Sequence, residues 1–456
     1  MARLEEDFTK GSIGAHLVRF SLPFLLANLL QSLYSVADMY IVGMFNDAAA
    51  LAGVNIGGQI TNLVAVLTIG LAQGGTVLVA QYFGAKRMND VTQTIGTLLT
   101  FLMLVSLALT AVMLVASQAM LQLIRTPIES MPEALAYLRI CLLGNVFIFG
   151  YNALGAIQRG LGDSKRPLMF VAVACVLNVG LDLLLVGGFG MGAAGAAWAT
   201  IASQAVSMAL AMMYLRRNNF VFDFRPSSFR IHWGKVSSIF HIGLPSSAQG
   251  VLVNFSFLLM TALVNGFGVY AAAAVGIVGK FNGFAILPAM AMSMSVSTMA
   301  AQNIGAGLHA RAKTGMMYGM WISLGIGAAM FAFTQLFPKW IIGLFSQDAQ
   351  VLAHGVDYLR TFSFDYICVP FTFCMGGLIT GAGHTTFSLL ASLTASVLLR
   401  MPAAWLLART PLGLSGIGLA APIASVGSSL MCAWFVLTKR WMRDVTGIST
   451  ASDQLL

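Results

Sequence analysis

The stretch Gln31–Gly43, which reads QSLYSVADMYIVG, decides how the chain must fold. It closes an apolar run over residues 17–42, and Asp38 stands inside that run. A carboxylate in a membrane span costs at least ~2.5 kcal/mol and by default marks an ion or substrate path. Tyr34 and Gln31 precede Asp38 by four and seven residues, so the three side chains share one helix face. The sequence therefore predicts a polar face that lipid cannot cover.

The composition places the chain in a membrane. Hydrophobic residues make up 58% of the 456 residues and charged residues only 9%, whereas soluble globular proteins carry about 25% charged residues. The apolar runs lack strand-like alternation, which favours helices over barrel strands. We therefore expect an all-α polytopic membrane protein with 12 transmembrane helices. The runs cover roughly 17–42, 50–80, 93–118, 134–158, 167–187, 192–215, 239–265, 271–300, 314–337, 355–380, 386–408 and 414–438.

The basic residues alternate between the two sides that twelve spans would create. Of the 25 lysines and arginines, 18 fall in the tails and loops of one side and four on the other, namely Arg125, Arg139, Lys339 and Arg409. By the positive-inside rule, this asymmetry predicts cytoplasmic N- and C-termini in a bacterial or archaeal cytoplasmic (inner) membrane. The net charge of +9 is then a topology signal, and we expect no nucleic-acid partner.

The two halves of the chain resemble each other at a nearly constant offset. Pro23 matches Pro245 at 222 residues, while the pairs AQYFGA/AQNIGA and GLGDS/GAGHT follow at 221. This register predicts a six-plus-six internal repeat, with lobes over 1–215 and 239–456 joined by a cytoplasmic linker over 216–238. Because each repeat has an even number of spans, the two share one orientation, which predicts a cleft between the lobes.

The first half carries polar residues that the second half lacks. Asp38, Asn178, Asp182 and Thr200 all map onto apolar residues of the second repeat. Asn178 and Asp182 share a face at i, i+4, and Thr200 shares a face with Gln204. Such oxygens suit a hard cation, and two carboxylates in a low dielectric would equally hold a proton. The pattern predicts a coupling site for H+ or Na+ and leaves the choice of ion open.

Three further residues allow two interpretations each. Asp365 in FSFDYICVP is either a second coupling or substrate-contact site or an acid near the extracellular interface. Arg400 either pairs with an acid or extends along its own helix towards the interface. Pro23 near the start of the first span is either a hinge that changes access to Asp38 or a kink for packing. No nucleophile–base pair, HExxH or P-loop is visible, so we expect neither an enzyme nor a cofactor beyond the coupling ion.

With these motifs in view, the chain resembles the multidrug and toxic compound extrusion (MATE) family of the MOP superfamily, and within it the DinF-like branch. The resemblance is carried by Pro23 and Asp38 in P-x14-D, and by GLAQGGTVLVAQYFGAKR, QRGLGDSKRP and NVGLD. It implies two six-helix lobes around a V-shaped cleft, and antiport of H+ or Na+ against an amphipathic, often cationic, drug. Gln249 stands where the NorM-like branch has a glutamate, which favours coupling through the first lobe. The implied site comprises Asp38, Asn178, Asp182 and Thr200, with Tyr34, Gln31 and Asn152 around them.

The charges within the spans bear on the cargo. Asp38, Asp182 and Asp365 stand against Lys280 and Arg400, which favours a cationic or neutral compound. We therefore expect a monomer whose partners are small-molecule drugs or toxic organic cations, together with membrane lipid. A lipid-linked oligosaccharide or lipid flippase of the same superfamily is the alternative. A channel fits the two-lobe repeat less well than a rocking transporter does.

Overall fold

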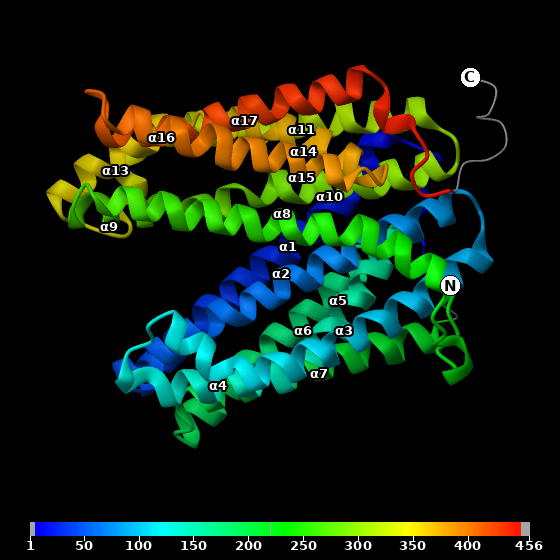
Figure 1. The fold of residues 1–456 in the computed structure, drawn as a ribbon, viewed down its shortest axis with the longest axis horizontal. Coiled ribbons are helices and arrows are strands. Elements are labelled where there is room, and N and C mark those ends of the chain that lie inside the picture. Colours follow the sequence, from blue (N-terminus) through cyan, green and yellow to red (C-terminus); the bar gives the residue numbers. More distant parts are fainter. Residues whose placement is uncertain (1–4, 219, 448–456) are drawn as a thin grey trace. The chain divides into compact units, whose positions relative to one another are not determined.

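The computed structural model describes residues 5–218 and 220–447, and this part of the chain is all-helical (Figure 1). Ten of its helices are long and apolar enough to cross a membrane, and two bent helix pairs raise the number of spans to as many as 12. The expected twelve spans are thus reached at the upper count. Arg3, one of the basic residues used for the topology prediction, lies outside the described residues.

Long helices follow directly from the apolar runs, because a backbone in lipid must satisfy its own hydrogen bonds. The α-helices are α1 (Ile13–Phe45), α2 (Ala48–Gly84), α3 (Met88–Leu123), α4 (Met131–Leu143), α5 (Asn145–Gly160), α6 (Lys165–Asp182), α7 (Gly192–Arg217), α8 (Trp233–Asn265), α9 (Val269–Ala285), α10 (Leu287–Gly305), α11 (His309–Leu336), α12 (Pro338–Gly343), α13 (Ala349–Phe362), α14 (Asp365–Gly381), α15 (Thr385–Leu393), α16 (Met401–Ala408) and α17 (Gly413–Leu437). Short 3₁₀ turns are η1 (Ile128–Ser130), η3 (Pro226–Ser228) and η5 (Arg440–Met442).

Two predicted spans are broken rather than continuous. The segment ending in α4 and the helix α5 meet at an angle of 50° on either side of Gly144, and α13 and α14 meet at 43°. A Cβ on Gly144 would lie 2.3 Å from the Ile201 side chain, so only glycine lets α7 approach the first break. Asp365 is the first residue of α14 and is buried at the second break. It therefore lies inside its bent span, not at an exposed end of it.

Two further spans contain a π-helical stretch. The stretch η2 (Leu183–Gly188) follows Asp182 directly, and η4 (Thr394–Arg400) ends at Arg400. A π-helix widens the turn and rotates the side chains beyond it, and it is common at functional sites. In both halves of the chain, then, a charged residue borders a local departure from α-helical geometry.

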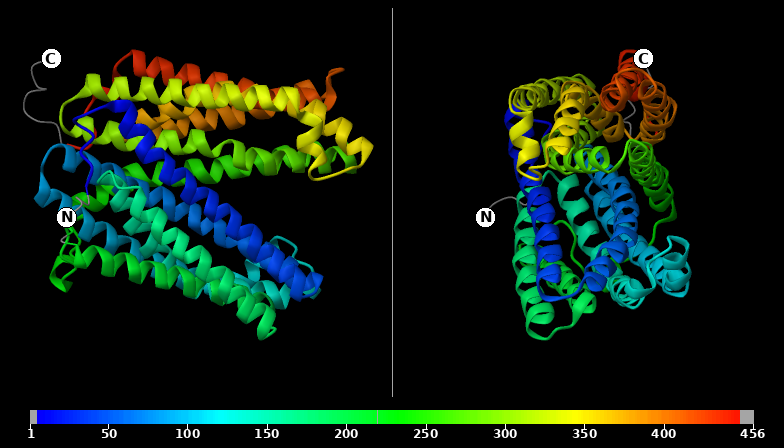
Figure 2. Two further views of the ribbon diagram at one scale, coloured as in Figure 1. Left: turned by 180° about the vertical axis from the view of Figure 1, so that it is seen from behind. Right: turned by 90° about the vertical axis from the view of Figure 1, so that its left-hand side faces the viewer.

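The contacts divide the chain into two compact units, and α1 and α8 each contribute to both. Unit 1 contains the described residues up to Glu6 together with Leu26–Ser247, and unit 2 contains Asp7–Leu25 together with the described residues from Ala248 onward. Within each unit the long helices run alongside one another (Figure 1, Figure 2). The two helices change unit two residues after Pro23 and two residues after Pro245. The lobe boundaries drawn from the sequence stay a prediction.

Close helix packing in unit 1 depends on glycine. A Cβ on Gly74 of α2 would lie 2.4 Å from the Ile239 carbonyl oxygen, and one on Gly243 of α8 would lie 2.8 Å from the Leu71 Cα. One turn further along, the Ser247 hydroxyl donates to the Leu67 carbonyl over 2.8 Å. Small residues thus let the first half of α8 rest directly on the α2 backbone, as is usual where two helices meet in a membrane.

The segment that precedes α1 packs within unit 2. Phe8 is 1% exposed, and its backbone N–H donates to Gln302 Oε1 over 2.9 Å. The Arg311 guanidinium donates to the Phe8 carbonyl over 3.1 Å. The Ser295 hydroxyl donates to the Leu17 carbonyl over 3.1 Å. The first turns of α1 therefore pack on α10 and α11 within the same unit.

Candidate functional site

The structure brings together the two carboxylates that the sequence singled out in the first half. Asp38 lies on α1 and is 8% exposed, while Asp182 is the last residue of α6 and is fully buried. The two side chains lie close enough for direct interaction between their carboxyl groups. Both residues belong to unit 1, so the pair is formed within one compact body.

Three of the four carboxyl oxygens of this pair have no hydrogen-bond partner among the described residues. Among the described residues, Asp38 Oδ1 and both carboxyl oxygens of Asp182 are buried without a hydrogen bond of ordinary geometry. The side-chain oxygen and nitrogen of Asn178, one turn before Asp182 on α6, are buried and unpartnered too. Leaving such a group unsatisfied costs about 1–3 kcal/mol each, more when it is charged. Carboxyl and amide groups that are buried without partners on both α1 and α6 are typical of a site for a ligand.

The residues around Asp38 include two that the sequence reasoning missed. Tyr34, on the same helix face, lies within electrostatic range of Asp38 and interacts with the Gln31 side chain. Tyr137 and Cys141 of α4 lie within range of the same carboxylate and are both buried. Their spacing of four residues was a usable signal.

Other predicted site residues lie nearby in unit 1, but no described hydrogen bond joins them to the acids. Thr200 and Gln204 are half-buried on α7, which packs against α6. Gln204 Oε1 is buried without a partner among the described residues, whereas the Thr200 carbonyl accepts from the Ser203 hydroxyl over 2.8 Å. Asn152 donates to the Ile148 carbonyl over 2.8 Å and so is engaged within its own helix.

The second half holds a different polar cluster, all of it in unit 2. Asp365 accepts a hydrogen bond of 2.5 Å from the Ser425 hydroxyl of α17. Arg400 is within electrostatic range of Asp365, and its guanidinium carbon lies 4.7 Å from the centre of the Phe257 ring. Gln249 of α8 donates to the Ser392 hydroxyl over 2.7 Å. This polar cluster thus contains one acid, Asp365, one base, Arg400, and neutral partners.

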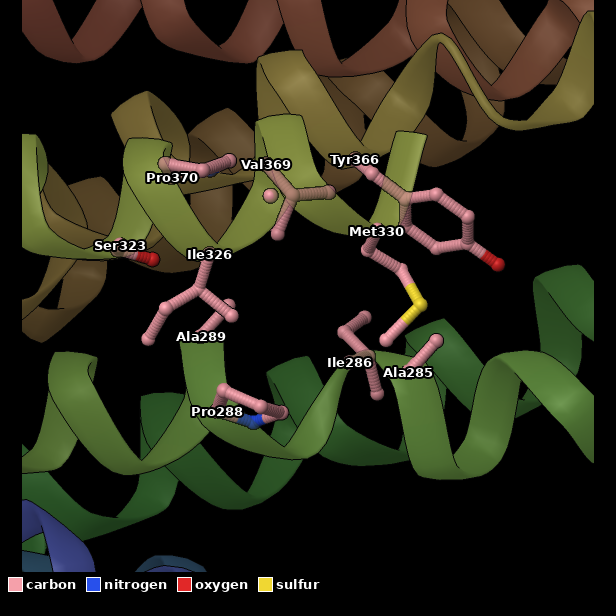
Figure 3. A pocket seen from close by; sticks show the side chains of 11 residues that line it. Ala285, Ile286, Pro288, Ala289, Ser323, Ile326, Met330, Tyr366, Val369 and Pro370 are labelled. Carbon is pink, nitrogen blue, oxygen red and sulfur yellow. The ribbon is translucent and has the colours of Figure 1, made fainter. Parts of the chain in front are cut away.

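Unit 2 also contains a small pocket between α9, α10, α11 and α14 (Figure 3). It encloses about 310 Å³ of space, including space open to solvent. Pro370 interrupts helical hydrogen bonding inside α14, Pro288 lies in the first turn of α10, and Gly327 lets α11 approach α14. No charged residue lines it, so it is not where a coupling cation would bind.

The chemistry of the Asp38–Asp182 pair suits a proton or a small cation. Within the described residues there is no group of three or more His, Cys, Asp or Glu side chains arranged to hold a metal ion. Two carboxylates with the Asn178 amide oxygen instead supply hard oxygen ligands of limited charge. Because two like charges in a low dielectric repel each other, the pair favours taking up at least one positive charge.

Comparison with known proteins finds similarity along nearly the whole chain. The family model described as MatE matches twice, over residues 23–184 and 245–406, so each half carries one copy, and the second begins 222 residues after the first. The chain is 31% identical to the probable multidrug resistance protein YpnP of Bacillus subtilis (strain 168) over 442 residues, covering 95% of this chain and 97% of that protein.

Two further comparisons show the breadth of the relationship. The FAD transporter of Shewanella oneidensis is 24% identical over 452 residues, covering 97% of this chain and 98% of that protein. A solved structure of a MOP superfamily transporter from Pyrococcus furiosus matches with a TM-score of 0.89 at 22% identity, covering 96% of this chain and 98% of that one. The last comparison confirms the predicted fold class.

Proposed function

Because the chain belongs to the MATE family of multi-pass membrane transporters and is not an enzyme, we propose that it is a cation-coupled antiporter that exports amphipathic organic compounds. H+ or Na+ would enter as the compound leaves, and the protein would alternate access between the two sides of the membrane. The relatives named for multidrug resistance support a drug-like cargo. Another relative is named for FAD, so the names of the relatives do not fix the charge of the cargo.

The observation that carries this proposal is the buried pair of Asp38 and Asp182. A carboxyl pair whose oxygens lack protein partners gains most from a bound cation, and an exchanged cation is what drives an antiporter. If ion and cargo favour opposite conformations, or compete for the same carboxylates, each displaces the other. Pro23 interrupts α1 fifteen residues before Asp38, which supports a bend that changes access to this acid.

We place the coupling ion in the first half and the chain in the DinF-like branch. Gln249 is neutral and bonded to Ser392, so it offers no second carboxylate on α8. Asn178, Thr200, Gln204, Asn152, Tyr34 and Gln31 would complete the ion site or contact the cargo. Asp365 would act separately from the coupling ion, because it already accepts a hydrogen bond from the Ser425 hydroxyl.

The charge asymmetry supports an orientation with both termini in the cytoplasm. We propose that the protein is a monomer in the cytoplasmic membrane.

The test is efflux of the fluorescent cation rhodamine 6G from proteoliposomes under an imposed proton gradient or an imposed sodium gradient. We expect one gradient to drive efflux, and Asp38→Asn to abolish that dependence. Asp47→Asn is the matched control, because Asp47 caps α2 by accepting from Ala50 N–H over 2.9 Å and asparagine caps equally well. Flux that ignores both gradients would favour the flippase alternative, and gradient-driven efflux by Asp38→Asn would refute the assigned site.

A further inference from the structure

Arg400 is a charged residue within a membrane span that the proposed mechanism does not use. It ends η4 in the span Thr385–Ala408, nine residues before Arg409. Nine residues of helix rise about 13 Å, which is more than an arginine side chain can reach. Arg409, at the end of that span, stacks on Trp405 at 3.5 Å and is the one placed for the membrane interface. Arg400 is therefore held inside the span, where a charge is costly and by default functional.

The guanidinium of Arg400 has no ion-pair partner in the described part of the chain. Every described ion pair within 4.0 Å involves other residues, although Asp365 is near enough to be influenced by the Arg400 charge. Asp365 is instead bonded to Ser425, on α17. Arg400 Nε is buried without a hydrogen-bond partner among the described residues. The guanidinium of Arg400 therefore has N–H groups left to bind an anion.

The surroundings of Arg400 suit an aromatic acid. The guanidinium carbon lies 4.7 Å from the centre of the Phe257 ring of α8, and Phe257 is 44% exposed. Arg400 itself is partly exposed, which contact with a ligand requires. The guanidinium carries its N–H groups in a planar fork, which matches a planar, bidentate acceptor such as a carboxylate or phosphate. An aromatic body could share the Phe257 platform.

From this arrangement we infer that unit 2 has an acid-recognition site, in which Arg400 binds a carboxylate or phosphate group of the transported molecule beside Phe257. The inference rests on the proposed function for the identity of the ligand as cargo. It extends the cargo from cationic and neutral compounds to zwitterionic and anionic amphiphiles. Arg400 then sets specificity, whereas Asp38 and Asp182 set coupling.

The test compares two dyes that differ only in this group. Rhodamine 19 carries a free carboxylate, and rhodamine 6G is its ethyl ester with the same cationic ring system. Binding to the full-length protein purified in detergent is measured by fluorescence anisotropy. We expect Arg400→Gln to weaken rhodamine 19 by roughly 10- to 100-fold, as for the loss of a charged hydrogen bond, and rhodamine 6G by less than about twofold. Arg400→Lys keeps the charge without the fork and should give an intermediate loss.

Arg409→Gln is the matched control, because it removes the other arginine of this span that stacks on an aromatic ring. It should leave both dyes unaffected. Equal losses for the two dyes in Arg400→Gln, or no loss for either, would overturn the inference. If Arg400→Gln does not fold, competition by benzoate is measured with the wild-type protein. The inference requires that benzoate displaces rhodamine 19 and does not displace rhodamine 6G.

The assay also separates this inference from the proposed function. Binding in detergent needs no ion gradient, so it should persist in Asp38→Asn, whose gradient-driven efflux should fail. Loss of acid selectivity at Arg400 with efflux of rhodamine 6G intact would confirm the division of roles. If the wild-type protein binds rhodamine 19 and rhodamine 6G equally well and still exports rhodamine 6G, only the acid-recognition site is refuted.

Discussion

Two buried acids of unit 1 should respond in opposite ways to the same substitution, and the contrast tests why Asp182 is there. Asp182 is fully buried, and neither of its carboxyl oxygens has a protein hydrogen bond among the described residues. Asp163, in the loop after α5, is 7% exposed and fully engaged. It forms an ion pair with Arg166 over 2.7 Å and accepts from the Lys165 N–H over 3.1 Å. Each is to be changed to asparagine, which keeps the shape and removes the charge.

The expected changes in the free energy of unfolding follow from these partners. Asp163→Asn loses a charge-assisted bond to Arg166 and should destabilise the protein by about 1.5–3 kcal/mol. Asp182→Asn loses no hydrogen bond of ordinary geometry to the described residues and removes a carboxylate from beside that of Asp38, so it should be neutral or stabilise by up to ~2.5 kcal/mol. A functional group that lowers stability is expected where a site is built for a ligand and not for the fold.

The assay pairs thermal unfolding of the purified protein with ion-driven efflux from proteoliposomes. Asp182→Asn should keep or raise the Tm and lose gradient-driven efflux. Asp163→Asn should lower the Tm and keep gradient-driven efflux per folded molecule. If Asp182→Asn lowered the Tm as much as Asp163→Asn did, its carboxylate would be a structural hydrogen-bonding group. If it kept full ion dependence, the coupling role would be wrong.

Two further predictions concern the scaffold. Gly74→Ala places a Cβ 2.4 Å from the Ile239 carbonyl oxygen, so it should lower the free energy of unfolding by about 1–3 kcal/mol and lower the Tm. Gly58→Ala is the control in the same helix, because its Cβ meets nothing within 4 Å, and it should raise the free energy of unfolding by up to ~1 kcal/mol. Equal effects of the two substitutions would show that α8 does not need this close approach. Burial lowers the pKa of His384, whose ring bonds to the Arg443 carbonyl. The unfolded chain therefore takes up the proton first, and stability should fall as the pH drops below about 6.5. The Tm of His384→Gln should fall less than that of the wild type between pH 7.5 and 5.5, and an equal fall would assign the pH response to other groups.

Hydropathy and repetition in the sequence determined the membrane class, the helical spans and the relation of the two halves. Those properties depend on each residue's own transfer from water and on its near neighbours along the chain. They also exposed Asp38, because a carboxylate inside an apolar run needs no structure to be recognised as costly. The comparison of halves set Asn178 and Asp182 beside it as unmatched polar residues, which the packing of α1 and α6 then brought into one unit.

The tertiary structure alone decided which of these residues meet. Asp38 and Asp182 are far apart in the chain, and their contact depends on how α1 and α6 are rotated against each other. The break before Asp365 and the π-helical stretch before Arg400 are local departures from α-helical geometry, and hydropathy averaged over a span does not register them. Tyr137 and Cys141 likewise became neighbours of Asp38 only through packing. Which face a helix buries is set by its partners, and partners are a property of the whole fold.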